Sequence, residues 1–233
     1  KHRQFRRVRF NKDLNEFWKR SFNLTYPHKG DLLMRLPTPL VVERDDFSIA
    51  IHSARSDSKI ADFIDDTPDT VSIEDLVGLG IVADMDSNLS PAQRFNTFAS
   101  AYAPIGCQVP SKPGLVAKGS PNTGIYILPD NDTHGTLESI LLECGRTSYP
   151  ELYEDAETFI NSARTDQLNS EDLSEFKKPA GKNKATINAM ASIFKPGKAI
   201  QTSIQDNKWI CPETLELPMI RKIDDFLAEL FEF

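Results

Sequence analysis

The sequence has few of the features that mark secreted or membrane proteins. Its three cysteines, Cys107, Cys144 and Cys211, are odd in number and widely spaced, which argues against a disulfide framework, and no Cys-x-x-Cys pair suggests zinc. The longest apolar runs, Ile125–Pro129 and Ile140–Leu142, are far shorter than the roughly 20 residues of a membrane span. The basic first residues lack the apolar stretch of a secretory signal. We therefore expect a soluble, cytoplasmic protein without a membrane partner.

Positive charge is also scarce, but it is unevenly distributed. The 233 residues carry a net charge of −7, which by itself disfavours a nucleic-acid binder. Lysine and arginine nevertheless cluster in the first twelve residues, which include Arg6 and Arg7, and again in Lys177–Lys184, which includes Lys182. These three residues are candidate phosphate contacts. For the first cluster, a solvated surface with an N-terminal arm for a protein partner is an equally good interpretation.

The order of the expected elements is that of an α/β protein. Residues 1–35 form a basic arm and a short helix, and residues 36–233 are expected to form one α/β domain with C-terminal helices. Two short apolar runs, Leu79–Ala83 and Thr123–Leu128, are typical of strands buried on both faces in a mostly parallel sheet. An acidic loop and then a helix follow each run, and Ser90 with Pro91 starts the first of these helices. Ligand sites of open α/β sheets lie at such strand ends.

Further segments complete this expected domain. Leu40–Val42 and Phe47–His52 have the composition of strands, and the spacing of Ile220 to Leu230 predicts a C-terminal helix that packs on the core. A helix is also expected over Ala185–Phe194, after a polar connection at Asp166–Gly181.

Asp84 and Asp86 follow the first buried strand directly. Two carboxylates one residue apart repel each other unless a cation neutralises them, and oxygen ligands favour magnesium or manganese. A helix-capping loop with solvated aspartates is the structural alternative. An EF-hand loop is excluded, because Leu89 and Phe95 replace its glycine and final glutamate. Asn88 does not fit a haloacid-dehalogenase motif, whereas a nucleotide-sugar transferase using Asp-x-Asp stays open.

Four further side chains are candidates for this chemistry, and two of them are expected near the same sheet edge. Thr136 and Glu138 lie in the first turn of a helix, where the helix dipole alone also favours a carboxylate. Lys184 is expected to start a helix, where a cation is unfavourable and needs a reason such as stabilising a phosphate transition state. His134 is a possible proton donor, although a loop histidine is more often incidental.

These segments together resemble a known family. Leu79–Asn88, Gly124–Glu138 and Asn183–Ala185, in this order and spacing, are similar to standalone Toprim-fold proteins of uncharacterised function related to the nuclease domain of OLD-family proteins. The resemblance covers residues 76–233 and implies two Mg²⁺ or Mn²⁺ ions for phosphodiester chemistry. It implies Asp84, Asp86, Thr136 and Glu138 as metal ligands and Lys184 as the residue that steadies transition-state charge.

The sequence departs from the family pattern at two places. The early Glu-Gly-x-x-Asp motif matches only Val41–Phe47, where Glu43 is the candidate ligand but the glycine is missing, and Asn183 replaces an aspartate. Two hypotheses follow. The first is a metal-dependent nuclease acting on DNA or RNA, possible as a homo-oligomer. Because the chain has no P-loop motif, it would work with a separate ATPase in a phage-defence module. The second is a Toprim-derived binding or regulatory subunit that has lost catalysis.

Overall fold

In a computed structural model of the chain, the structure describes residues 40–43, 48–54, 58–65, 67, 72–85, 89–178 and 180–233. The expected N-terminal arm and helix, with Arg6 and Arg7, lie outside the described residues, and so does Asp86. The expected domain boundary between residues 35 and 36 lies outside them as well. The chain divides into two compact units, Lys1–Leu76 and Val77–Phe233, and each is described by itself.

The described part of the first unit contains a small antiparallel hairpin. Strand β1 (Leu40–Glu43) pairs antiparallel with β2 (Ser48–Ile51). Helix α2 (Ser58–Asp65) follows, and then a short 3-10 helix, η3 (Ile73–Asp75). The two strands confirm the two strands expected here, and they pair antiparallel.

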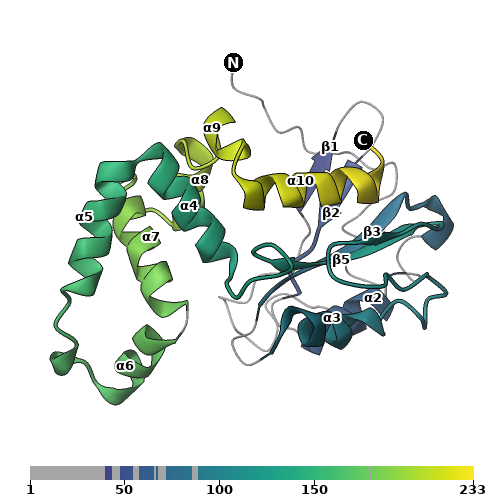
Figure 1. The fold of residues 1–233 in the computed structure, drawn as a ribbon, viewed down its shortest axis with the longest axis horizontal. Helices are drawn as coiled ribbons and strands as arrows, with labels where there is room; N and C mark the ends of the chain where they lie inside the picture. The colour runs from purple at the N-terminus through teal and green to yellow at the C-terminus, as the bar shows by residue number, and fades with distance from the viewer. Residues whose placement is uncertain are drawn as a thin grey trace, which may run out of the picture. The chain divides into compact units, whose positions relative to one another are not determined.

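The second unit is built on a mixed sheet of three described strands (Figure 1). Strand β3 (Gly78–Asp84) pairs parallel with β5 (Asn122–Leu128), which lies in the middle. On its other side β5 pairs antiparallel with the two-residue strand β4 (Val116–Ala117). The sheet is therefore mixed, with one longer parallel pair and one short antiparallel pair among its described strands. The broader expectation of an α/β fold with helices flanking the sheet is confirmed.

Helices make up most of the second unit, and none in the described part of the chain is long and apolar enough to cross a membrane. They are α3 (Pro91–Ala99), α4 (Leu137–Ser148), α5 (Pro150–Asn161), η4 (Thr165–Gln167), α6 (Ser170–Lys177), α7 (Gly181–Phe194), α8 (Ile200–Asp206), α9 (Pro212–Leu215) and α10 (Pro218–Phe231). The stretch expected to be a polar connection thus contains α6. Helix α7 begins at Gly181, so Lys184 lies inside its first turn rather than at its start.

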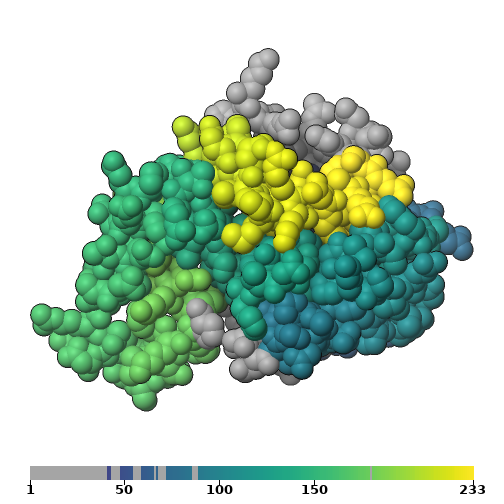
Figure 2. All heavy atoms as spheres, in the orientation of Figure 1, coloured from purple at the N-terminus to yellow at the C-terminus, as the bar shows by residue number. Residues whose placement is uncertain are grey.

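Strand β5 is covered on both faces. Helix α10 packs so closely on one face that a Cβ on Gly124 would lie 2.6 Å from Phe226 Cε2. On the other side the buried Tyr102 hydroxyl donates to the carbonyl of Gly124 at 2.8 Å and also contacts the Leu79 carbonyl. Figure 2 shows the α10 atoms, in yellow, lying directly on the atoms of the sheet segment. Strand β3 differs, because Val82 is 50% exposed, so the expected burial of both its faces is wrong.

Helix α4 belongs to two hydrophobic clusters at once. Ile140 and Cys144 pack with Tyr126 of β5 and with α10. Leu141 packs into a second cluster with Ile187 of α7 and with side chains of α5 and α8. This double packing places the N-terminal turn of α4 between the end of the sheet and the first turn of α7.

Candidate metal and phosphate site

Asp84 is the last residue of β3, and its carboxylate reaches the start of α4. In the parallel register Asp84 lies beside Leu128, the last residue of β5. Its Oδ1 accepts a hydrogen bond from the backbone N–H of Leu137 at 2.9 Å. Leu137 is the first residue of α4, so the helix dipole favours the negative charge at this position. Leu137 itself is 48% exposed beside this carboxylate.

Glu138 and Lys184 meet at the same helix end. The Thr136 hydroxyl donates to Glu138 Oε2 at 2.6 Å and fixes one oxygen of that carboxylate. Lys184 Nζ lies 3.8 Å from Glu138 Oε1, and its side chain is 61% exposed while that of Glu138 is 21% exposed. The carboxylate is thus held on one side by the Thr136 hydroxyl and faces an exposed cation on the other.

The pKa of Asp84 is raised, mainly by burial and to a smaller extent by a nearby like charge. Although the residue as a whole is exposed, the protein around its carboxyl removes water from it, and this burial raises the pKa of Asp84 above its ordinary value. The nearby Glu138 carboxylate raises the pKa further. The Leu137 N–H, Lys184 and Arg94 act in the opposite direction but do not offset the rise. A divalent cation between the two carboxylates would remove this penalty.

Arg94 is a charged neighbour that sequence reasoning missed. It lies on α3, is 5% exposed, and donates from Nε to the backbone carbonyl of Asp84 at 2.9 Å. The start of its helix is fixed as expected, because Ser90 Oγ accepts from the Gln93 N–H and the Gln93 side chain accepts from the Ser90 N–H. The available signal was an arginine in a short helix whose other buried residues are aromatic.

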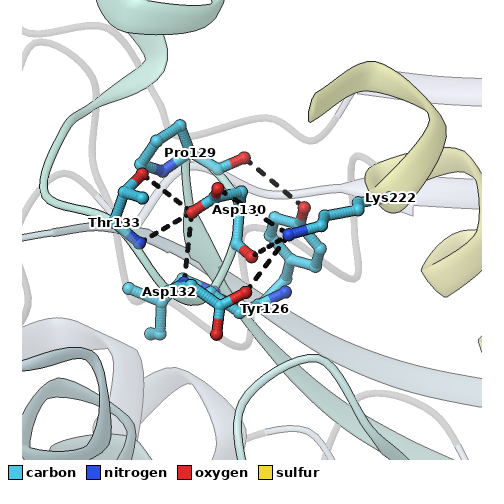
Figure 3. Close-up of polar contacts among 8 residues, drawn as sticks. Tyr126, Pro129, Asp130, Asp132, Thr133 and Lys222 are labelled. Carbon is cyan, nitrogen blue, oxygen red and sulfur yellow. Dashed lines mark hydrogen bonds and ion pairs between the residues drawn. The ribbon is translucent and has the colours of Figure 1, made fainter. Parts of the chain in front are cut away.

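The acidic loop after β5 is built differently (Figure 3). Asp130 Oδ1 accepts from the N–H groups of Asp132 and Thr133 and from the Thr133 hydroxyl, at 2.8 to 3.1 Å. Lys222 of α10 lies 3.7 Å from Asp130 Oδ2 and 3.1 Å from Asp132 Oδ2. Burial would raise the pKa of Asp130, but these hydrogen bonds and Lys222 outweigh it and hold the pKa below its ordinary value. This loop is a turn whose charges are satisfied within the chain.

A family model described as "Protein of unknown function (DUF3226)" matches residues 31–232. The chain belongs to this family. Neither the comparison with curated proteins nor the comparison with solved structures finds a match. For this DUF3226 protein, arguments about function therefore depend on the site itself.

The structure brings together four of the candidate residues, Asp84, Thr136, Glu138 and Lys184. Lys182 instead donates to Asn161 Oδ1 at 3.3 Å, and His134 is exposed in the turn before α4. Glu43 ends β1 in the first unit, and its side chain lies outside the described part of the structure, as does Asp86.

The donor atoms of this DUF3226 site fit a hard divalent cation. Asp84 and Glu138 offer carboxylate oxygens and Thr136 a hydroxyl, the ligand chemistry of magnesium and manganese. Among the described residues, no group of three or more histidine, cysteine, aspartate or glutamate side chains is arranged to hold a metal. Magnesium needs no such cage, because it commonly keeps several waters and takes one or two carboxylates together with substrate phosphates.

Proposed function

We propose that this protein is a divalent-metal-dependent nuclease with a Toprim-like site that hydrolyses phosphodiester bonds in DNA or RNA. The observation that carries the proposal is the meeting of Asp84, Glu138 and Lys184, which come from the end of a strand and the first turns of two helices. Two carboxylates can hold a divalent metal ion, and an exposed lysine beside them can stabilise negative charge on a phosphate. The resemblance of the three sequence segments to Toprim-fold proteins supports the same conclusion.

Each residue has a role that follows from its contacts. Asp84 and Glu138 would hold Mg²⁺ or Mn²⁺, as one ion or as a pair with ligands such as Asp86. The bound ion supplies Lewis acidity and a water of lowered pKa. Thr136 restricts the Glu138 carboxylate through its 2.6 Å hydrogen bond. Lys184, with most of its side chain in solvent, is free to contact a non-bridging phosphate oxygen and stabilise developing charge.

The proposed partners are a nucleic acid and a separate ATPase. Lys182 is exposed in the same helical turn as Lys184 and adds positive charge for a phosphate backbone. The sequence carries no Gly-x-x-x-x-Gly-Lys-Ser/Thr loop, so nucleotide-driven control would come from another chain, as in a phage-defence module. A nuclease that acts on its own would disprove the dependence on an ATPase without affecting the assignment of the site.

The test combines cleavage and metal binding. Purified protein is incubated with plasmid DNA and structured RNA in Mg²⁺ or Mn²⁺, and Mn²⁺ binding is measured by calorimetry. Asp84→Ala and Glu138→Ala are expected to abolish cleavage, whereas Asp132→Asn, which changes an exposed carboxylate of the neighbouring loop, is expected to retain it. Cleavage that is unchanged in both alanine variants would contradict the proposed site.

A second candidate function is a binding or regulatory subunit that has lost catalysis. The observation that favours it is the small ligand set, because no group of three metal-binding side chains is present among the described residues. The same titration separates the two functions. A folded wild-type protein that binds no Mn²⁺ at sub-millimolar concentration, and that cleaves neither substrate, would favour the subunit without catalysis.

A further inference from the structure

Arg94 is a buried charge beside the end of β3. It lies in α3 with 5% of its surface exposed, between the buried aromatic residues Phe95 and Phe98 and the end of β3. Burying a guanidinium is expensive unless its charge and donors are used. An apolar side chain would pack against the two phenylalanines at lower cost, so the interactions of the arginine need an explanation.

The described contacts of the guanidinium include a hydrogen bond and a cation–π contact. Its Nε donates to the backbone carbonyl of Asp84 at 2.9 Å, and its central carbon lies 4.8 Å from the ring centre of Phe98. Phe98 is 1% exposed, so this ring is itself held by the core. The arginine therefore ties the last carbonyl of β3 to a rigid element of the fold.

Two features restrict the backbone at Asp84. Arg94 holds its carbonyl, and the next residue, Met85, is buried at 4% exposure. With the backbone fixed in this way, the Asp84 carboxylate stays within 2.9 Å of the Leu137 N–H and near Glu138. The positive charge of Arg94 also acts on this carboxylate and favours its ionised form.

We infer that Arg94 is a positioning residue of the metal site, which holds the end of β3 so that the Asp84 carboxylate faces Glu138. This inference rests on the proposed function, because it concerns the same pair of ligands. Residues that orient metal ligands from behind typically contribute a factor of about 10 to 100 in metal affinity. The effect should therefore be visible in binding itself, without any assay of cleavage.

The experiment measures Mn²⁺ affinity by calorimetry, and thermal stability in EDTA, for the full chain and three variants. Arg94→Met removes the donor and the charge, and Arg94→Lys keeps the charge but loses the planar fork. Arg146→Met is the matched control, because Arg146 also lies 4.8 Å from an aromatic ring, that of Tyr153, but belongs to the last turn of α4.

We expect Arg94→Met to bind Mn²⁺ about 10 to 100 times more weakly, Arg94→Lys to fall between it and the wild type, and Arg146→Met to bind normally. Wild-type affinity in folded Arg94→Met would overturn the inference. Equal losses in both Arg94 variants that follow their loss of thermal stability would assign a structural role and also overturn it. If Arg94→Met does not fold, the test depends on Arg94→Lys. Wild-type Mn²⁺ affinity in that variant would also overturn the inference. Absent binding in the wild type would instead refute the proposed function.

Discussion

Asp84 and Asp130 lie at or just after the ends of two neighbouring parallel strands, yet their surroundings differ in hydrogen-bond donors and in nearby charges. Asp130 receives three hydrogen bonds within its own turn and faces Lys222. The Asp84 carboxylate accepts one hydrogen bond among the described residues, from the Leu137 N–H, and it lies near a second carboxylate. Both loops look alike as acidic sequences after an apolar run, so it is the supply of donors that separates them.

The pKa values follow this difference. The pKa of Asp130 is lowered, whereas that of Asp84 is raised by burial and by Glu138. A carboxylate whose hydrogen bonds and ion pairs are made within the protein contributes to stability. A carboxylate that is repelled by a second carboxylate is a candidate cation ligand. Under the proposed function, we therefore expect a structural role for the Asp130 loop and a metal-binding role for Asp84, and each expectation can be tested.

The largest expected effect is on metal binding. Asp84→Asn removes a ligand charge, and since even residues behind a metal ligand contribute 10- to 100-fold, we expect Mn²⁺ affinity to fall by at least about 100-fold. Asp130→Asn is expected to bind Mn²⁺ as the wild type does. Calorimetric titration of the three proteins measures this directly. A comparable loss in both variants would mean that the two loops do not differ in the way proposed.

The next effect is on stability. Asp130→Ala leaves the N–H groups of Asp132 and Thr133 without their acceptor, and hydrogen bonds to a charged group contribute about 1.5–3 kcal/mol. We expect the free energy of unfolding in urea to fall by about 1–3 kcal/mol.

The pH dependence of this loss has a definite sign. Because the folded pKa of Asp130 is lowered, its contribution is present above the unfolded pKa and is lost as the pH falls through the folded value. The difference between wild type and Asp130→Ala should therefore shrink in acid. A difference that instead grows in acid would contradict the role of the ionised carboxylate.

A third, smaller effect separates the two lysines of the comparison. Lys184 faces Glu138 at 3.8 Å, whereas Lys222 faces the Asp130 loop. Lys184 competes with a cation for the Glu138 carboxylate, and an exposed ion pair of this length contributes about 1 kcal/mol or less in water. Lys184→Met should then bind Mn²⁺ several-fold more tightly while cleaving more slowly, and Lys222→Met should bind it normally. Weaker Mn²⁺ binding in Lys184→Met would show that the lysine supports the metal rather than competing with it.

The sequence predicted the local parts of this site well. Ser90 and Pro91 start α3, the two apolar runs form the parallel pair β3 and β5, and Glu138 lies in the first turn of α4. These features depend on caps, runs and spacing over a few residues, which act in the same way in any fold.

What depends on distant packing could not be predicted. The contact of Arg94 with Asp84, and that of Lys222 with Asp130, requires the positions of α3 and α10 on the sheet. Helix α6 was missed because its residues are polar and none is buried, so no apolar periodicity marks it. The exposed face of β3 at Val82 was missed because a continuous apolar run does not show which neighbours are present.

The smallest expected effect is a gain in thermal stability on substituting Asp84, opposite in sign to the loss expected for Asp130. Because the folded pKa of Asp84 is raised, the proton favours the folded state, and the contribution of this residue is present at low pH and lost as the pH rises through the folded pKa. Asp84→Asn mimics the neutral form and keeps an acceptor for the Leu137 N–H. In EDTA near neutral pH we therefore expect this variant to melt higher than the wild type. Solvent screens an exposed group, so the rise should be only about 1–2 °C.

Thermal scans of both proteins between about pH 4 and about pH 7 check this last effect. The advantage of Asp84→Asn should grow with pH, the opposite of any change caused by substituting Asp130. Saturating Mn²⁺ should reverse it, because the cation binds the wild type and stabilises its folded state by mass action. If Asp84→Asn melts below the wild type in EDTA at every pH, then Asp84 is a structural carboxylate like Asp130. The raised pKa would then have no functional meaning, and the difference between the two loops would be lost.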